Sequence, residues 1–548
     1  MPLIGLSNYI FLQASTPALP SDSGHPEGLY VLFFTEMWER FGYYLILGIF
    51  SLYMLDSKAH GGMGFLPSQK SDVYGTYLGL LYLTPFIGGL LADRILGYRR
   101  SIIIGGILMA SGYFGLSMGG EAGFYPSLLL IIFGNGFFKP NISTLLGNLY
   151  NDERYKSKKD AGYNIFYAGI NLGAFLCNFV AAYMRINYGW GWAFGAAGVG
   201  MLIGLVVFLS GSSAVKSADV LKPVQEGDMG TGKIFLTVLL PMVIFGVIGY
   251  LLPGNIFGSD TNDAFLIGCL PVIGFFIYLY ISANKADKGP IGSLLAVFAC
   301  LVVFWAVFHQ NGDALTVWAD QYTDRAIPEM VAEPIKSANM AQVLVNDPAD
   351  PSHDKYLKYT QNLPSDQQPA KGSSLILASA ELYQSINPFW VILLTPIVVG
   401  FFGFLGRKGK EPTTPAKIAI GLLITALSAF VMVMAVKSTD MNSEKASSFW
   451  LFAAYGVITI GELCLSPMGL SLVSKLSPTR ITALMMGGFF LSTSVGNKLS
   501  GILSSMWESY EDKSQFFLMN FVLVLPAAII MFVLLKWLNR VMREKGLN

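Results

Sequence analysis

Charged residues are scarce in this sequence, and their scarcity excludes an ordinary soluble protein. Asp, Glu, Lys and Arg make up 13% of the 548 residues, whereas soluble domains usually carry about 25%. Hydrophobic residues make up 53% and gather in long blocks, which is typical of a polytopic membrane protein. The net charge of +1 gives no basic excess of the kind that nucleic-acid-binding proteins carry.

Cysteine is also scarce. The four cysteines all lie within apolar blocks, at Cys177, Cys269, Cys300 and Cys464. We interpret them as small core residues without disulfide bonds or a metal. The sequence shows no nucleophile–base or metal-ligand pattern, and its N-terminus lacks the basic region of a signal peptide. We therefore expect neither an enzyme nor a cofactor.

Apolar blocks long enough to cross a bilayer recur along the whole chain. A membrane-spanning helix needs about 20 mostly apolar residues, and fourteen blocks meet this need. The predicted spans are residues 29–55, 72–95, 100–119, 124–149, 159–185, 190–211, 232–252, 262–283, 290–317, 380–405, 416–437, 447–475, 479–506 and 514–540. Lysine and arginine gather in alternate short loops, so the positive-inside rule predicts that both termini are cytoplasmic.

Two polar segments interrupt this pattern. Residues 212–233 are polar and divide the chain into two halves. Residues 319–378 are acidic and proline-rich and should lie outside the cell, between the ninth and tenth spans. Because few apolar residues are present there to build a core, we favour a small surface excursion or a disordered segment over a binding module.

The stretch TEMWERFGYY, residues 35–44, places charges in the middle of the first span. Glu36, Glu39 and Arg40 share one helical face, because residues three and four apart do so, and Tyr43 and Tyr44 continue this face. A charged group at mid-span costs roughly 2.5–3.5 kcal/mol, so this face must line a polar cavity. A Glu–Arg pair that only fixes helix packing is the alternative, but it leaves one carboxylate unexplained, and such a group usually binds a proton.

Other predicted spans also carry polar residues at membrane depth. Together they predict a cavity with two cations, three carboxylates and several amides and hydroxyls: Arg40, Lys139, Glu36, Glu39, Glu462, Asn171, Asn387 and Ser466. This set suits a zwitterion, because the cations can bind a carboxylate while Glu462 and the asparagines bind an amine. Spare carboxylates can carry protons. For Lys139 alone, a buried ion pair with a packing role is the alternative.

The stretch GGLLADRILGYRR follows the second span and lies at the cytoplasmic edge of the membrane. Gly89 and Gly97 suit a close approach of helices, and Asp93 can bond a neighbouring helix end or basic residue. Arg94 and the arginines after it are also explained by ordinary positive-inside anchoring.

These motifs together resemble one family. GGLLADRILGYRR is similar to the loop signature of the major facilitator superfamily. EMWERF and FYAGINLGAF resemble the E-x-x-E-R and F-Y-x-x-I-N-x-G motifs of the proton-dependent oligopeptide transporters. FWAVFHQNG, SINPFW and GELCLSPMGLSLVSKL resemble segments of their seventh, eighth and tenth helices. The resemblance covers residues 27 to 540, apart from 319–378.

The resemblance implies an all-α polytopic membrane protein with the major facilitator superfamily fold, in which two six-helix bundles enclose the site. Bacterial members carry two additional helices between the bundles, which gives fourteen spans. The expected organisation is a cytoplasmic tail at 1–28, a bundle at 29–211, a linker with two helices at 212–288, a bundle at 289–540 with the insert 319–378, and a tail at 541–548.

The resemblance also implies a function and roles for single residues. It implies a symporter in the bacterial cytoplasmic membrane that imports di- and tripeptides together with protons. Arg40 and Lys139 would hold the peptide carboxylate beside Tyr43, Tyr44 and Tyr82, while Glu36 and Glu39 would be coupled to protonation. Asn171, Asn387 and Glu462 would hold the peptide amine, with Ser466 in the same span as Glu462.

Three positions depart from the family pattern. Leu47 stands where relatives often have an arginine, and His309 stands where they often have an acidic residue, so a possible outer salt bridge has lost both partners. Phe489 stands where relatives commonly have tryptophan. We predict that His309 is a pH-sensitive gate element with Asp313 nearby. A neutral, hydrogen-bonded histidine in the outer vestibule is the alternative.

Two other functions stay open at this point. A relative of this family can carry another solute, such as a peptide-like drug, nitrate or a glucoside, although Lys139 and Glu462 together suit a zwitterion better than a simple anion. A peptide sensor that does not transport is the second alternative, but we expect no signalling domain after the last span. The sequence does not determine the oligomeric state.

Overall fold

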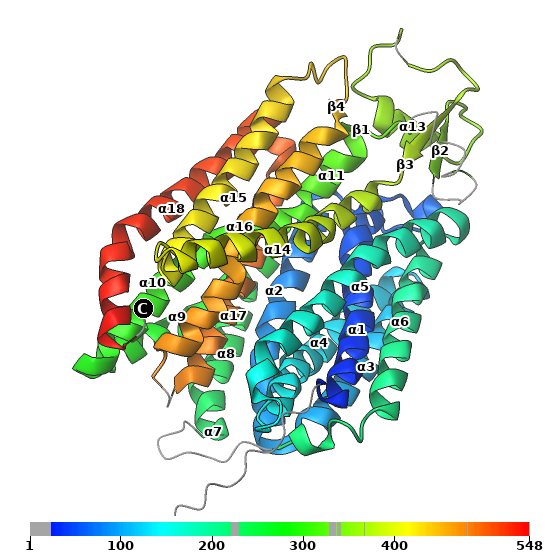
Figure 1. The fold of residues 1–548 in the computed structure, drawn as a ribbon. Coiled ribbons are helices and arrows are strands. Elements are labelled where there is room, and N and C mark those ends of the chain that lie inside the picture. Colours follow the sequence, from blue (N-terminus) through cyan, green and yellow to red (C-terminus); the bar gives the residue numbers. More distant parts are fainter. Residues whose placement is uncertain are drawn as a thin grey trace, which may run out of the picture.

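The computed structural model describes residues 24–220, 230–327, 336, 341–366, 368–478 and 481–546. Helices dominate these residues and form two groups that lie side by side (Figure 1). The N-terminal half consists of α1 (Glu27–Leu55), α2 (Pro67–Leu91), α3 (Tyr98–Ser117), α4 (Glu121–Leu149), α5 (Lys159–Tyr188) and α6 (Trp190–Ser210). The π-helical turn η2 (Ala92–Leu96) continues α2.

The C-terminal half is built in the same way. Its helices are α10 (Lys285–Phe308), α11 (Ala314–Gln321), α14 (Ile386–Arg407), α15 (Thr414–Lys437), α16 (Ser448–Leu476), α17 (Thr482–Ser505) and α18 (Lys513–Glu544). Between the halves lie α7 (Thr231–Ile234), η5 (Phe235–Leu239), α8 (Leu240–Leu251) and α9 (Asp260–Ser282). Short turns of helix are η1 (Lys58–His60), η3 (Lys156–Lys158), η4 (Lys216–Ala218), η6 (His309–Gly312), η7 (Ala380–Ser385) and η9 (Trp507–Ser509).

Local sequence sets several helix ends. Pro67 begins α2, where its missing N–H removes no hydrogen bond. The Ser259 side chain accepts a hydrogen bond of 3.1 Å from the backbone N–H of Asn262 and so caps the start of α9. Gly189 separates α5 from α6 with φ of 92°, a conformation that residues with a Cβ rarely adopt.

The helices have the length and composition of membrane spans. Within the described residues, twelve helices are long and apolar enough to cross a membrane. The helices α1 and α17 are also longer than the roughly 20 residues that a span needs. Their polar residues face the protein interior, since Glu39 on α1 and Lys498 on α17 are fully buried. With these two, the described residues contain fourteen helices long enough to span a membrane, which agrees with the predicted number, and the protein is a multi-pass membrane protein.

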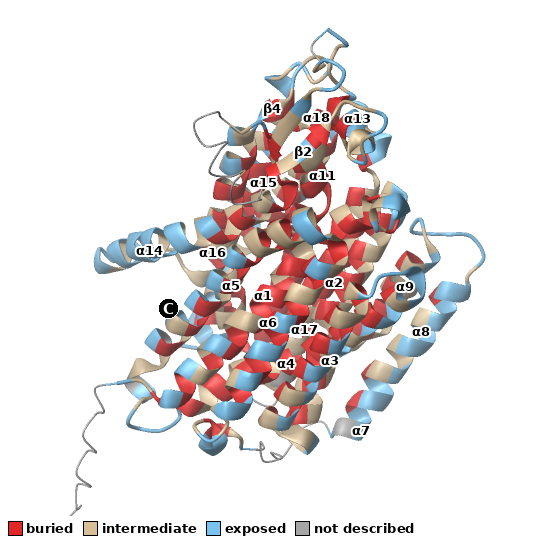
Figure 2. Cartoon of the chain, turned by 90° about the vertical axis from the view of Figure 1, so that its right-hand side faces the viewer, coloured by how far each residue is buried: buried red, intermediate tan, exposed pale blue. Residues whose placement is uncertain are grey.

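Burial separates the protein interior from the face that contacts lipid. Buried residues gather in the middle of the molecule, whereas α14 extends to the left of the view and is exposed along most of its length (Figure 2). Apolar side chains on α8 and α14 are exposed, as expected where lipid rather than protein surrounds a helix.

The two halves pack tightly along α2 and α17. A Cβ atom on Gly75 would lie 2.8 Å from the Cα atom of Gly501, so only glycine permits this approach. The Ser494 hydroxyl donates a hydrogen bond of 2.7 Å to the backbone oxygen of Gly79. The Lys498 ammonium pairs with Asp72 at 2.7 Å. These contacts hold the C-terminal half against α2.

The segment between α11 and α14 is folded in its described part, which corrects the sequence prediction. Strand β2 (Ala341–Val345) pairs antiparallel with β3 (Ser374–Ala378), and α13 (His353–Thr360) lies between them in the chain. Four residues form a small core: Leu344, Tyr356, Tyr359 and Leu377. The prediction that this segment lacks a core is wrong, because two tyrosines supply the apolar area. We call β2, α13 and β3 with their connections the outer module, residues 341–378.

A second sheet, made of two strands with two residues each, joins the chain next to this region to the helices. Strand β1 (Thr323–Asp324) follows α11 and pairs parallel with β4 (Ala446–Ser447), which precedes α16. The outer module is therefore joined to the C-terminal half at the end that the sequence places outside the cell (Figure 1).

Candidate functional site

A cavity of about 310 Å³ lies between the two halves. Residues from α1, α2, α4 and α5 of the N-terminal half line it, and residues from α10, η6, α14, α16 and α17 of the C-terminal half face them. The predicted site residues on its wall are Glu36, Arg40, Tyr43, Tyr44, Tyr82, Lys139, His309, Asn387, Glu462, Ser466 and Phe489. The structure thus brings residues that are more than 400 positions apart in the sequence to one cavity.

Arg40 is the centre of the charged cluster in the N-terminal half. Its guanidinium donates a hydrogen bond of 2.7 Å from Nη2 to Oε1 of Glu39 and pairs with Oε1 of Glu36 at 3.2 Å. A second contact joins its Nε to Oε2 of Glu39. All three side chains are at least 96% buried. One cation therefore serves two carboxylates, and any gain or loss of a proton on either carboxylate changes how firmly Arg40 is held.

Glu39 lies behind the cavity wall, not on it. It is fully buried and absent from the lining residues, whereas Glu36 and Arg40 reach the cavity. Oε2 of Glu36 is buried and makes no hydrogen bond with any described residue. Such an oxygen readily binds a proton, because burial of an unpaired carboxylate oxygen is costly.

Lys139 forms the second positive group of the cavity. Its Nζ lies 4.0 Å from the centroid of the Tyr82 ring, a favourable cation–π distance. The Arg40 guanidinium lies 4.6 Å from the ring centroid of Tyr43, and Tyr44 packs edge-on against Tyr43. Both cations thus lie against aromatic rings, and Arg40 also bonds Glu36 and Glu39, so its donors become available to an anion only when those carboxylates release them.

The opposite wall carries a carboxylate and an amide. Asn387 on α14 donates hydrogen bonds from Nδ2 to Oε2 of Glu462 at 3.2 Å and to the hydroxyl of Thr459 at 2.9 Å. Both partners lie on α16 and are separated by three residues, so they share one face of that helix. The C-terminal half therefore presents a negative group toward the positive groups of the N-terminal half.

The cavity is closed on its outer side. Three interactions join the halves there: Ser51 donates to the backbone oxygen of Gly312 at 2.7 Å, Lys70 pairs with Asp313, and Arg185 pairs with Glu381 at 2.6 Å. The lining residues extend instead toward the opposite ends of the helices, where Ser143, Tyr163 and Leu470 are found. If both termini are cytoplasmic, as the sequence predicts, this arrangement faces inward.

His309 begins η6 and lies on the cavity wall. The centroid of its ring is 5.8 Å from that of Tyr82 and 5.1 Å from that of Trp305. Its Nδ1 is buried and makes no hydrogen bond with a described residue. Asp313, which was expected near His309, pairs with Lys70 from α2, and a role for Asp313 beside His309 stays a prediction.

Like Glu39, Asn171 is a predicted cavity residue that the structure does not place on the cavity wall. It is absent from the lining, and its side-chain amide donates a hydrogen bond of 2.9 Å to the backbone oxygen of Tyr167 on its own helix. Phe489 does reach the cavity wall, where it packs edge-on against Phe298.

Several polar residues at the outer end of the cavity were not predicted from the sequence. The Gln384 side-chain amide donates to the hydroxyl of Thr316 at 2.7 Å, and Asn178 donates to Ser385 at 3.1 Å. Tyr455 lies two helical turns before Glu462, on the same face of α16. Helical spacing from Glu462 could therefore have predicted Tyr455 as a cavity residue. Gln384 belongs to a 3₁₀ turn, and no periodicity in the sequence indicates its position.

The cytoplasmic motif after α2 is folded around Gly97. This residue has φ of 79°, and a Cβ atom there would lie 3.3 Å from Oδ1 of Asp219. Asp219, which was not predicted, accepts a hydrogen bond of 2.8 Å from the backbone N–H of Tyr98 and so caps α3. Asp93 accepts a hydrogen bond of 2.7 Å from the Tyr98 hydroxyl.

Glycines bring α2 and α4 close together near this motif. A Cβ atom on Gly89 would be at ordinary contact distance from Pro140, 3.5 Å. Gly88 is the tighter position, because a Cβ atom there would lie 2.0 Å from the backbone oxygen of Gly136. Arg94 lies in the π-helical turn that ends α2. The predicted close helix approach is therefore present, but it depends on Gly88 more than on Gly89.

Comparison with known protein families agrees with this geometry. The sequence model of the POT family matches residues 99–344 and 374–519. The chain belongs to the POT family. This family consists of transporters, not enzymes, and the predicted fold class is confirmed. The match leaves out residues 345–373, which form most of the outer module.

Individual relatives cover nearly the whole chain. An uncharacterized transporter, YclF, of Bacillus subtilis is 30% identical over 93% of each chain. The peptide transporter YePEPT of Yersinia enterocolitica is 30% identical over 89% of each chain. A solved structure of the peptide transporter POT in complex with sulfate has a TM-score of 0.75 at 28% identity and covers 96% of this chain and 98% of that one.

Proposed function

We propose that this POT-family protein is a proton-coupled symporter that imports di- and tripeptides by alternating access. The observation that carries the proposal is the polarity of the central cavity. Arg40 and Lys139 place two cations on its N-terminal wall, where Glu36 can neutralise Arg40, and Glu462 with Asn387 places a carboxylate on its C-terminal wall. A short peptide has a carboxylate at one end and an ammonium group at the other, so its two ends match the two walls.

Peptide binding would pull the two halves together. The carboxylate would bind Arg40 and Lys139, and the amine would bind Glu462 and Asn387. Because these residues belong to different halves, a bound peptide bridges the interface and favours closure around it. A simple anion such as nitrate would use only the positive wall, and we therefore favour peptides over it.

Proton binding would control whether Arg40 is available to the peptide carboxylate. When Glu36 or Glu39 is protonated from outside, it pairs less strongly with Arg40, which is then available to the peptide carboxylate. When the proton leaves toward the cytoplasm, Arg40 pairs again with its glutamates and its hold on the peptide weakens. The three side chains are already in contact, so this exchange needs only small movements.

We place the protein in the cytoplasmic membrane of a bacterium with both termini inside the cell. The support is the gathering of lysine and arginine in alternate loops. The roles of Tyr43, Tyr44, Tyr82 and Ser466 in holding a peptide follow from their place on the cavity wall. His309 is proposed as a pH-sensitive element of this wall.

Competition between peptides tests the match of the two walls. Uptake of labelled dialanine should be inhibited by unlabelled dialanine, whereas N-acetyl-dialanine and dialanine amide should inhibit at least about tenfold more weakly. Each blocked peptide lacks one charge, and a hydrogen bond to a charged group contributes about 1.5–3 kcal/mol, or roughly tenfold or more in affinity. Inhibition by both blocked peptides as strong as that by dialanine, or strong inhibition by nitrate, would contradict the proposal.

A further inference from the structure

Most of the outer module falls in a gap inside the POT family match. The match stops at residue 344 and resumes at 374, and the described residues between these points include α13. No described residue of 345–373 lines the central cavity. Its contacts therefore indicate a separate role.

The module is firmly attached to the C-terminal half. The Arg325 guanidinium donates hydrogen bonds to the backbone oxygen of Ala378 at 2.6 Å, to Gln342 at 3.1 Å and to Oδ1 of Asp320 at 3.0 Å. Arg325 is only 2% exposed, and it also stacks over the ring of Tyr359. These bonds join β2 and β3 to the end of α11, so the module moves with the C-terminal half.

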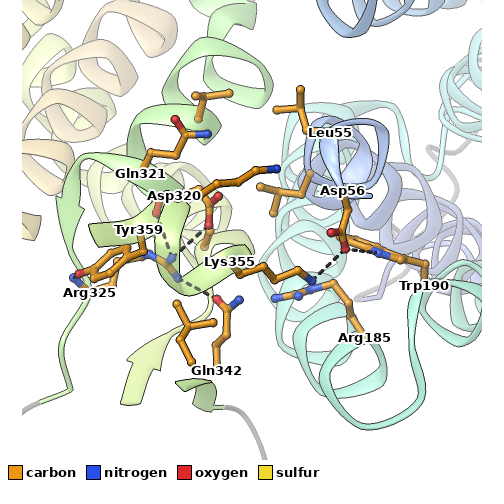
Figure 3. A pocket seen from close by; sticks show the side chains of 15 residues that line it. Leu55, Asp56, Arg185, Trp190, Asp320, Gln321, Arg325, Gln342, Lys355 and Tyr359 are labelled. Atoms are coloured by element: carbon orange, nitrogen blue, oxygen red, sulfur yellow. Dashed lines mark hydrogen bonds and ion pairs between the residues drawn. The ribbon is translucent and has the colours of Figure 1, made fainter. Parts of the chain in front are cut away.

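The module also reaches across to the N-terminal half. Nζ of Lys355 on α13 pairs with Oδ2 of Asp56, at the outer end of α1, at 2.9 Å (Figure 3). Nε2 of His60 lies 2.7 Å from the backbone oxygen of Pro351, just before α13. Lys355 and Asp56 line a small cavity of about 70 Å³ that residues of both halves enclose.

Asp56 is held in place by its own half. Its carboxylate accepts hydrogen bonds from the indole of Trp190 at 2.9 Å and from the backbone N–H of Ser57 at 3.0 Å. Burial acts to raise the pKa of Asp56, but the charge and hydrogen bond of Lys355 and the bonds from Trp190 and His60 outweigh it and lower the pKa below its ordinary value. Asp56 is therefore ionised at neutral pH in the closed structure, and the bonds from Trp190 and Ser57 hold its carboxylate in position within the N-terminal half.

We propose that the outer module is a latch that stabilises the outward-closed state through the Lys355–Asp56 pair. The pair joins the two halves at their outer ends, so it exists only while those ends are together. When the halves separate on the outer side, Asp56 keeps its other partners and Lys355 returns to water. The latch thus shifts the equilibrium between the two states toward the closed one. The proposal assumes the alternating access proposed above but not the identity of the solute.

The proposal is tested by the rate at which a cysteine inside the closed interface reacts. Ser51 is fully buried and bonds to Gly312 across the interface, so Ser51→Cys should react with a membrane-impermeant maleimide on intact cells only when the outer side opens. The four native cysteines are buried, and the protein without Ser51→Cys gives their background rate.

We expect Lys355→Met to raise this rate about three- to tenfold and Lys355→Arg to leave it near that of the parent. Lys358→Met is the matched control. Lys358 lies one turn further along α13 and lines the same small cavity, but it makes no ion pair with a described residue, so this variant should react at the parent rate. Reaction of Lys355→Met at the parent rate, or an equal increase in Lys358→Met, would overturn the proposal.

A double variant tests whether Lys355 and Asp56 act through their ion pair or through their other contacts. Asp56→Asn can still accept the Trp190 hydrogen bond but lacks the charge that pairs with Lys355. If the two residues act through their pair, the variant with both Asp56→Asn and Lys355→Met should react no faster than the faster single variant. If the rate increases of the two single variants multiply in the double variant, the latch proposal is wrong. The readout needs no transport, so it stays informative if peptide uptake fails.

Discussion

At the scale of single residues, Arg40 connects substrate binding to proton binding. It contacts Glu36 and Glu39 while its guanidinium also reaches the cavity. Removal of one partner from a buried ion pair costs about 3–5 kcal/mol when a charge is left unpaired. The cluster is therefore sensitive to the protonation of either glutamate, which is the property that coupling requires.

The first prediction concerns these two glutamates. Glu36→Gln and Glu39→Gln each mimic the protonated state permanently, so we expect proton-driven peptide uptake to fall by about tenfold or more in each variant. Exchange of labelled for unlabelled peptide should be partly retained, because it needs no net proton movement. Gradient-driven uptake at the parent level in both variants would exclude these glutamates from coupling.

The second prediction concerns His309. If its imidazole gains and loses a proton during transport, uptake by His309→Gln should lose the part of its pH dependence that falls near the ordinary titration range of histidine. Glutamine keeps a polar group of similar reach without a titratable nitrogen. Uptake measured from pH 5.5 to 8 decides the matter, and an unchanged pH profile would favour the alternative of a neutral, structural histidine.

Much of the residue-level site could be predicted from the sequence, because charge inside an apolar span is costly and rarely lacks a use. That reasoning found Arg40, Lys139 and Glu462. It failed for Asn171, because an asparagine can satisfy its amide on its own helix and so costs less to place away from a cavity. It also missed the Lys70–Asp313 pair, which joins residues whose proximity depends on how the halves are packed.

At the scale of helices, the close packing of α2 against α17 depends on a pair of glycines. Gly75 and Gly501 face each other at a distance that excludes a Cβ atom. The long apolar helices were predicted near their observed positions, because hydrophobic length determines them, although the predicted span 290–317 continues past the end of α10 into η6 and α11. The sequence does not indicate which spans pack together, since most helices here are apolar on several faces and the contacts depend on small residues far apart in the chain.

The third prediction tests this contact between α2 and α17, which we call the α2–α17 seam. Gly75→Ala would place a Cβ atom 2.8 Å from the Cα of Gly501, and overpacking of this kind costs about 1–3 kcal/mol. We expect a lower thermal unfolding temperature in detergent. Gly400→Ala on α14 is the control, because no heavy atom lies within 4 Å of a Cβ there, and it should unfold at the same or a higher temperature. Equal behaviour of both variants would show that the seam tolerates a side chain.

The outer module shows a different limit of sequence analysis. Its polar composition pointed away from a core, yet Tyr356 and Tyr359 are nearly fully buried. A small core of this kind forms because the module also packs on a larger body, to which Arg325 binds it. Composition alone does not reveal such support from a neighbouring domain.

At the scale of the whole molecule, interactions between the halves close the structure at the end that carries the outer module. The Arg185–Glu381 pair and the Lys70–Asp313 pair lie at this end, together with the proposed latch. Alternating access requires these bonds to break while the α2–α17 seam adapts. The relative position of the halves changes during transport and is set by ligand and proton occupancy, so no single position could be predicted from the sequence.

The most direct measurement of the central claim is uptake of labelled dialanine by the purified protein in liposomes. With an inward proton gradient, we predict that dialanine accumulates inside above its external concentration. When the gradient is collapsed, only equilibration should remain. Accumulation that does not depend on the gradient, or no uptake of dialanine and several other di- and tripeptides under either condition, would contradict the account.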